Sequence, residues 1–98
     1  MFARLTAYQM RQGAKEEATD VMNSLREQIM AMPGILEFTN ILGTDGAGYI
    51  LTIAESEAQS NANAAKTAAL WAKFAPYMVA LPKAQGYEVM ANWIKQGR

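Results

Sequence analysis

The sequence predicts a single α+β domain, spanning residues 1–98, whose elements follow the order β-α-β-β-α-β. Apolar residues alternate with a period of two in four stretches, which is typical of strands. They recur every three or four residues in two longer stretches, which is typical of amphipathic helices. A chain of 98 residues fits one domain, and no linker or low-complexity segment interrupts it.

The first strand is expected from Phe2 to Met10 and the first helix from Ala14 to Met32. Alternation gives the strand one apolar and one mixed face. The helix carries an apolar stripe formed by Ala18, Val21, Met22, Leu25, Ile29 and Met32. Pro33 lacks an amide proton and disfavours a helical conformation of the residue before it, so the helix should end at Met32.

A hairpin across a glycine-rich turn forms the centre of the chain. Its strands are expected at Ile35 to Leu42 and Tyr49 to Ala54, and Asp45-Gly46 supplies the positive-φ positions that such a turn requires. Both strands carry apolar residues on both faces. Because the helices can cover only one face, we expect a second subunit to cover the other.

The second helix should begin at Ser56, which forms a capping box with Gln59. An alanine stripe marks its first half: Ala58, Ala62, Ala65, Ala69 and Ala72. A stripe of large apolar residues marks its second half on roughly the opposite side: Leu70, Trp71, Phe74 and Met78. One straight helix cannot bury both stripes against one sheet. We therefore expect a bend or break between Thr67 and Leu70, or contact of the second stripe with a partner chain. The last strand is expected from Gln85 to Ile94.

Composition excludes several classes of function. Nine basic residues balance nine acidic ones, so neither a nucleic-acid partner nor an anionic membrane surface is expected. The chain has no cysteine and no histidine, which removes thiolate metal sites, the commonest general base and the usual haem ligand. Apolar residues make up 51% of so short a chain, which favours an oligomer. No membrane-spanning stretch or signal peptide is apparent, so a cytoplasmic location is expected.

The order and spacing of these elements resemble the dimeric α/β-barrel superfamily, and within it the antibiotic-biosynthesis-monooxygenase-like domains. The resemblance covers almost the entire chain and depends on the central hairpin and three turn or cap motifs: Gln12-Gly13, Met32-Pro33-Gly34-Ile35 and Glu55-Ser56-Glu57-Ala58. It implies a ferredoxin-like antiparallel sheet with two helices on one face and a homodimer formed through the opposite faces. It also implies a ligand pocket between helices and sheet. Members include cofactor-independent oxygenases of polycyclic phenols and haem-degrading enzymes.

Haem-degrading relatives use an Asn on the first strand, a Trp on the second helix and a His ligand near the end of that helix. By spacing from the shared motifs, these positions fall at Thr6, near Asn63 and near Lys73. None of the three residue types is retained. The resemblance therefore disfavours haem degradation, and no cofactor and no metal are expected.

Three residues are candidates for catalytic roles. Arg4 and Tyr8 share the mixed face of the first strand, where an Arg with a Tyr could stabilise an oxyanion on a phenolic substrate. Asn40 places a polar amide on an otherwise apolar face, where it could orient a ligand. The alternatives are an ion pair of Arg4 with a surface or partner carboxylate, packing of Tyr8 at the core edge, and an ordinary hydrogen bond of Asn40 to a neighbouring side chain.

Six further residues are candidates for ligand binding: Thr6, Phe38, Trp71, Phe74, Tyr77 and Asn92. The aromatic residues of the second helix could form a wall on which flat ligands stack. Core packing or dimer contact is the alternative, and we assign Tyr87 and Trp93 to the dimer interface. The glycines of the hairpin form a turn and do not match a nucleotide-binding fingerprint.

These observations predict a small-molecule-binding protein that resembles cofactor-independent monooxygenases acting on aromatic or quinol-type substrates. Without histidine, the base would have to be a carboxylate, a tyrosinate or water. A non-catalytic ligand-binding or stress-related homodimer is the alternative, and a purely structural partner domain is the third possibility. The expected ligand is a small apolar or aromatic molecule.

Overall fold

Four strands form one antiparallel sheet in the order β2-β3-β1-β4. The strands are β1 (Phe2–Gln9), β2 (Ile35–Leu42), β3 (Ala47–Ala54) and β4 (Lys83–Glu88). The computed structural model describes residues 1–80 and 82–95. With the helices inserted after β1 and after β3, this order is the ferredoxin-like topology, so the predicted fold class is confirmed.

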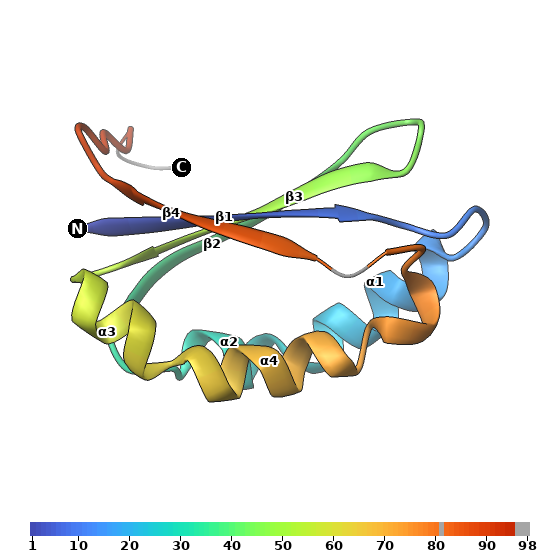
Figure 1. Cartoon of the computed structure of the whole chain (residues 1–98), viewed down its shortest axis with the longest axis horizontal. Helices are drawn as coiled ribbons and strands as arrows, with labels where there is room; N and C mark the ends of the chain where they lie inside the picture. The colour runs from blue at the N-terminus through green and yellow to red at the C-terminus, as the bar shows by residue number, and fades with distance from the viewer. Residues whose placement is uncertain (81, 96–98) are drawn as a thin grey trace.

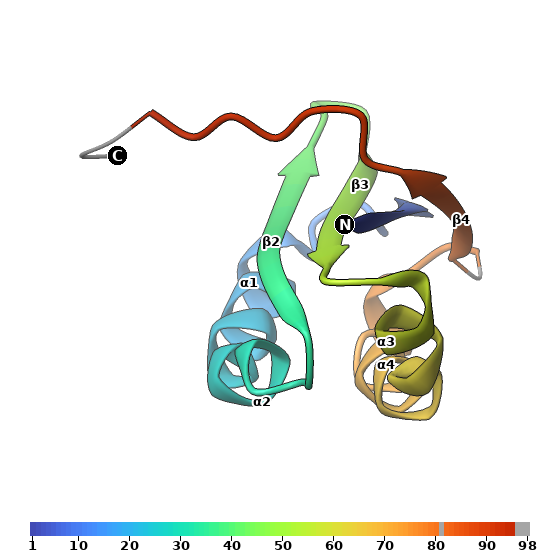
Figure 2. The same cartoon turned by 90° about the vertical axis from the view of Figure 1, so that its left-hand side faces the viewer.

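All helices lie on one face of the sheet (Figure 1). The first connection contains α1 (Lys15–Ser24) and α2 (Arg26–Met30); the second contains α3 (Glu57–Ala62), α4 (Ala64–Ala72) and the short 3-10 helix η1 (Ala75–Tyr77). Figure 2, viewed from the end, shows α1 and α2 under β2, and α3 and α4 under the other edge of the sheet. The two helical connections therefore lie side by side in one layer on the same face of the sheet (Figures 1 and 2).

The first helical segment is interrupted at Leu25, where we had expected a continuous helix. The Ser24 hydroxyl donates a hydrogen bond to the Val21 carbonyl oxygen at 2.6 Å, and such local side-chain bonds compete with the helical backbone pattern. Leu25 and Ile29 are both buried, which indicates that the apolar stripe stays on one side despite the interruption. The helical region ends before Pro33, as predicted.

The second helical segment breaks at Asn63, and the predicted position between Thr67 and Leu70 is wrong. Asn63 is only 7% exposed, and its side-chain amide donates to the Pro33 carbonyl oxygen at 2.8 Å. This bond fixes α3 and α4 to the turn that follows the first helical segment. Alanine has the highest helix propensity and needs no packing partner to favour a helix. The alanine stripe accordingly faces solvent, and its members are Ala58, Ala62, Ala65, Ala69 and Ala72.

A β-bulge reverses the expected orientation of the first residues of β2. The register shifts between Ile35 and Glu37, so Ile35 pairs with Ala54 and lies on the helix side of the sheet. Leu36, expected on the same face as Phe38, is instead 47% exposed. The rest of β2 follows the predicted alternation.

The last strand is shorter than the predicted Gln85 to Ile94 and is displaced toward the N-terminus. β4 pairs only with β1, and Glu88 lies opposite Phe2, where β1 begins. Because β1 begins at Phe2, residues after Glu88 have no strand residue of β1 to pair with. The Val89 amide donates one more hydrogen bond, to the Met1 carbonyl oxygen, and the chain then leaves the sheet. Trp93 is consequently 93% exposed rather than part of a strand.

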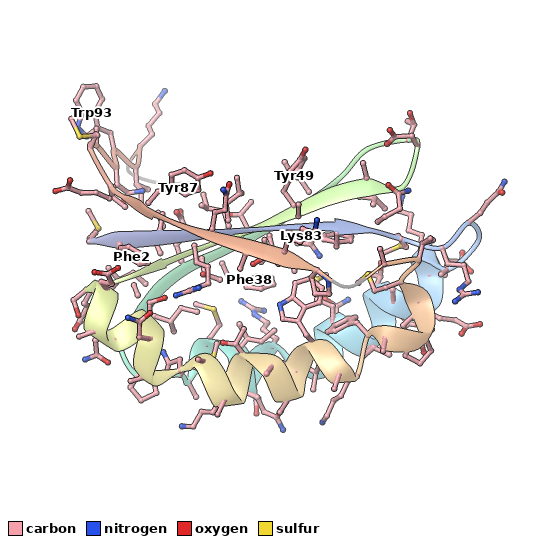
Figure 3. All side chains as sticks on the ribbon, in the orientation of Figure 1. Phe2, Phe38, Tyr49, Lys83, Tyr87 and Trp93 are labelled. Atoms are coloured by element: carbon pink, nitrogen blue, oxygen red, sulfur yellow. The ribbon has the colours of Figure 1, made fainter. Side chains whose placement is uncertain are left out.

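The sheet face away from the helices carries exposed apolar side chains. Tyr49 and Tyr87 point away from the helices in Figure 3, whereas Phe2 and Phe38 lie between sheet and helices. Ile41 and Leu36 are also largely exposed. Among the residues described, no helix is long and apolar enough to cross a membrane.

Candidate functional site

A cavity of about 430 Å³ lies between the sheet and the helices. All four strands and helices α1 to α4 contribute to its walls, which are mainly apolar. No large side chain in the described part of the chain is fully buried, so the space between the layers is incompletely filled. Its volume and its apolar walls with few polar groups are typical of small-molecule sites.

Most of the sequence-predicted site residues line this cavity: Arg4, Thr6, Tyr8, Phe38, Asn40, Trp71 and Phe74. Strand alternation explains the first three, because alternate residues of β1 point to the same side of the sheet. The mixed face of β1 is therefore the one that meets the helices. The catalytic or binding role of each residue stays a prediction.

Two predicted residues lie outside the cavity walls. Tyr77 belongs to η1, where its carbonyl oxygen accepts a hydrogen bond from the Arg11 amide at 2.7 Å. Asn92 follows β4 in the segment that has left the sheet, because the expected strand ends at Glu88.

Tyr8 and Asn40 form a hydrogen-bonded pair at one end of the cavity. The Tyr8 hydroxyl donates to Asn40 Oδ1 at 2.6 Å and lies 3.4 Å from the Ile41 carbonyl oxygen. Burial raises the pKa of Tyr8 above its usual 10.0, and the Asn40 hydrogen bond offsets this only in part. Tyr8 is therefore a neutral hydroxyl at pH 7, which argues against the tyrosinate base considered from the sequence.

The Asn40 amide nitrogen has a weak partner. It donates to the Met22 sulfur at 3.1 Å, and a thioether is a poor hydrogen-bond acceptor. A ligand oxygen entering this end of the cavity would be a better acceptor. The pair thus offers an amide donor and a hydroxyl oxygen to a ligand.

Aromatic rings form one wall beside this pair. The Trp71 ring lies 5.8 Å from Tyr8 and 6.1 Å from Phe74, with interplanar angles of 55° and 63°. These separations and tilts are those of favourable aromatic pairs. The wall is continuous with the polar pair, so a flat ligand could contact both.

Arg4 lies at the other end of β1. Its Nε donates to Ser60 Oγ and its Nη2 to Asn61 Oδ1, both at 3.1 Å. Tyr8 is four residue steps along the strand from Arg4, which places their backbones about 13 Å apart. Joint action of Arg4 and Tyr8 on one oxyanion, as proposed from the sequence, is therefore not favoured by the geometry.

Several lining residues were not anticipated from the sequence: Met22, Ser60, Asn63 and Thr67. Asn63 and Thr67 lie one turn apart and share a face with Ser60 and Trp71, but the alanine stripe of this region points to solvent. Gly48 is a second missed signal. It lies opposite Tyr8 in the β1–β3 ladder, and a Cβ at this position would overlap the Tyr8 ring.

The cavity walls contain no His, Cys, Asp or Glu in the described part of the chain that could bind a metal ion. Within residues 1–80 and 82–95, no group of three or more His, Cys, Asp or Glu could hold one. Thr6 and Asn63 line the cavity at the positions that the resemblance relates to the haem-degrading Asn and Trp, and the chain has no histidine. These residues do not fit a haem site of that kind.

Comparison with known proteins finds likeness in structure alone. No family model matches the chain, and no curated protein matches it in sequence. A protein of unknown function from Nitrosomonas europaea, NE2512, superposes with a TM-score of 0.80 at 18% identity, covering 98% of this chain and 95% of that one.

Two enzyme-related structures are similarly close in fold. A monooxygenase from the gene ActVA-Orf6 of Streptomyces coelicolor, in complex with the ligand Nanaomycin D, superposes with a TM-score of 0.76 at 20% identity, covering 97% and 92% of the two chains. A mutant of MhuD, with two manganese protoporphyrin IX bound per active site, gives 0.76 at 19% identity over 97% and 100%. This chain therefore has the ferredoxin-like fold of the antibiotic-biosynthesis-monooxygenase-like structures.

Proposed function

We propose that this protein binds a flat, mainly apolar aromatic molecule between its sheet and helices, and that it oxidises quinol-type substrates without a cofactor. The observation that carries the proposal is the apolar cavity of about 430 Å³ with the Tyr8–Asn40 pair and the Trp71 ring in its walls. The Streptomyces monooxygenase that holds Nanaomycin D in the same fold supports it.

In this proposal the ligand ring packs against Trp71 and Phe74, and a ligand oxygen meets the Tyr8–Asn40 pair. The Asn40 amide exchanges its weak contact with the Met22 sulfur for a bond to that oxygen. An amide donor in a largely apolar cavity stabilises negative charge on the oxygen more than it would in water. Relative to the same cavity without this donor, the Asn40 amide would favour the phenolate over the phenol.

The chemistry we propose is the reaction of that phenolate with molecular oxygen. The substrate for this step is an anthrone-type molecule, whose enol tautomer is the phenol that ionises. One O₂ is consumed per substrate: the ring CH₂ carbon of the keto tautomer becomes a carbonyl, the second oxygen atom leaves as water, and the four electrons taken from the carbon reduce the O₂. No external reductant is needed. The protein binds and orients the phenolate and excludes water. Because neutral Tyr8 is a poor base, the first proton goes to solvent water or to buffer as the substrate enters.

Oxygen uptake with a panel of polycyclic anthrones tests the proposal. Asn40→Ala should lower kcat/KM by about 10²-fold, the order expected for loss of one preorganised donor to an oxyanion. Asn92→Ala is the matched control, because Asn92 is the same residue type outside the cavity walls. No oxygen uptake by the wild type across the panel would refute the oxygenase proposal.

A non-catalytic ligand-binding or stress-related protein is the second candidate, and the absence of histidine and of a lining carboxylate among the described residues favours it. It predicts that polycyclic aromatics raise the melting temperature without oxygen uptake. Failure of every aromatic ligand to stabilise the protein would reject both candidates and leave a structural role.

We also propose that two copies associate through the outer faces of their sheets. Exposed Leu36, Ile41, Tyr49 and Tyr87 on that face support this, as does the high apolar content of so short a chain. Association would cover the apolar face that the helices leave open. Association would also stabilise a domain whose own hydrophobic core is small.

A further inference from the structure

The charged side chains that line the cavity are both cationic. They are Arg4 on β1 and Lys15 at the start of α1, and no Asp or Glu is among the lining residues of the described chain. The whole sequence carries equal numbers of acidic and basic residues, so its carboxylates lie elsewhere. The charged groups that line the cavity are therefore of one sign, although the net charge of the chain is zero.

Arg4 is held in place without being neutralised. Its hydrogen bonds to Ser60 and Asn61, the ones formed within the described residues, go to a hydroxyl and an amide oxygen. A guanidinium has five N–H donors in a planar fork, so these bonds use two and leave three for a ligand. Such a fork matches the two oxygens of a carboxylate.

The surroundings of Arg4 increase the contribution of a carboxylate contact to the binding free energy. Arg4 is partly buried, and its guanidinium carbon lies 6.0 Å from the centre of the Phe2 ring. Phe2 in turn lies against Gly86 of β4, where a Cβ would overlap the ring. A charge-assisted bond in this partly desolvated position is stronger than at an open surface. Lys15 is exposed and lacks that enclosure.

We propose that the ligand of this cavity is an aromatic acid whose carboxylate binds Arg4; this rests on the small-molecule-binding function proposed above. A second oxygen of the same ligand meets the Tyr8–Asn40 pair at the other end of β1. Because the Arg4 and Tyr8 backbones are about 13 Å apart and the two side chains are held by different elements, α3 and β2, the acid group and that oxygen lie on different parts of the ring system. The cavity thus discriminates by charge at one end and by hydrogen bonding at the other.

Two probes of nearly equal shape test this: anthraquinone-2-carboxylate and the neutral anthraquinone-2-carboxamide. Calorimetric titration of the full chain at fixed ionic strength should show the carboxylate binding at least tenfold more tightly. Arg4→Gln should weaken binding of the carboxylate at least tenfold and binding of the carboxamide much less, so that the preference disappears. Arg26→Gln is the matched control, because it removes the same charge from an exposed position on α2 outside the cavity.

Each other outcome has a distinct meaning. Equal affinity of the wild type for the two probes overturns the charge proposal and leaves cavity binding intact. Binding of neither probe counts against the proposed function itself and removes the charge proposal with it. A carboxylate preference that survives Arg4→Gln and disappears in Lys15→Gln overturns the assignment to Arg4. Thermal unfolding checks that each variant folds, and Arg4→Lys, which keeps the charge and loses the fork, should retain only part of the preference.

Discussion

Replacing Tyr8 by Phe tests the polar pair at the end of the cavity most sharply. The change removes one hydroxyl, which donates at 2.6 Å to Asn40 Oδ1, and leaves the ring and its contact with Trp71 in place. Loss of a hydrogen bond that leaves a largely buried acceptor without a partner costs about 1–3 kcal/mol. Because Asn40 is only partly buried, we expect about 1–2 kcal/mol, or a fall in melting temperature of about 4–15 °C for a domain of this size.

A double-mutant cycle separates the bond from other effects of the substitution. Asn40→Leu removes the acceptor, and the double variant Tyr8→Phe with Asn40→Leu leaves neither group unpaired. We expect a coupling energy of about 1 kcal/mol in urea unfolding at fixed protein concentration, with Tyr77→Phe as a control outside the cavity. Equal effects of Tyr8→Phe in both backgrounds would refute the claim that this pair is formed and energetically coupled.

Four further predictions follow from particular contacts. Burial raises the pKa of Tyr8, so the folded state holds the hydroxyl proton more tightly than the unfolded state does. The resulting contribution to the free energy of unfolding is present below about pH 10 and is lost as pH rises through the folded pKa. Urea unfolding of Tyr8→Phe should not show this loss of stability at high pH. Gly48→Ala should cost about 1–3 kcal/mol in unfolding free energy because a Cβ overlaps the Tyr8 ring, and an equal cost in a Tyr8→Ala background would contradict this. Asn63→Ala should cost about 1 kcal/mol by losing the bond to the Pro33 carbonyl, with exposed Asn23→Ala on α1 as its comparison; equal effects would count against the anchoring role. Ile41→Glu on the outer sheet face should give monomers in light scattering, whereas Met30→Glu on α2 should not; a monomeric wild type would reject the dimer.

The sequence predicted the fold because its strongest signals are local and agree with one another. Pro33 ended the first helical region, Gly46 adopted the positive φ expected in the hairpin turn although Asp45 did not, and the Ser56 hydroxyl capped α3 by accepting a hydrogen bond from the Gln59 amide at 3.1 Å. Each depends on backbone chemistry that needs no tertiary partner. The errors arose where tertiary context decides, as at Asn63, whose partner lies thirty residues away in the turn at Pro33.

The location of the candidate site was predictable from β1, and its internal geometry was not. Alternation placed Arg4, Thr6 and Tyr8 on one face, and the structure puts that face against the helices. Their spacing along the strand already separated Arg4 from Tyr8, but the hydrogen bonds that fix each end come from α3 and β2. Asn92 could not be excluded from sequence, because the end of β4 depends on where β1 begins.

The seven methionines provide the most direct test of the central claim, that a ligand occupies the space between sheet and helices. Met10, Met22, Met32 and Met78 line the cavity, whereas Met30 lies on the exposed side of α2. In a two-dimensional NMR titration of ¹³C-methyl-labelled methionines with anthraquinone-2-carboxylate, ring currents should shift the four cavity methyls and leave Met30 unchanged. Shifts confined to methionines outside the cavity would place the ligand elsewhere and contradict the account.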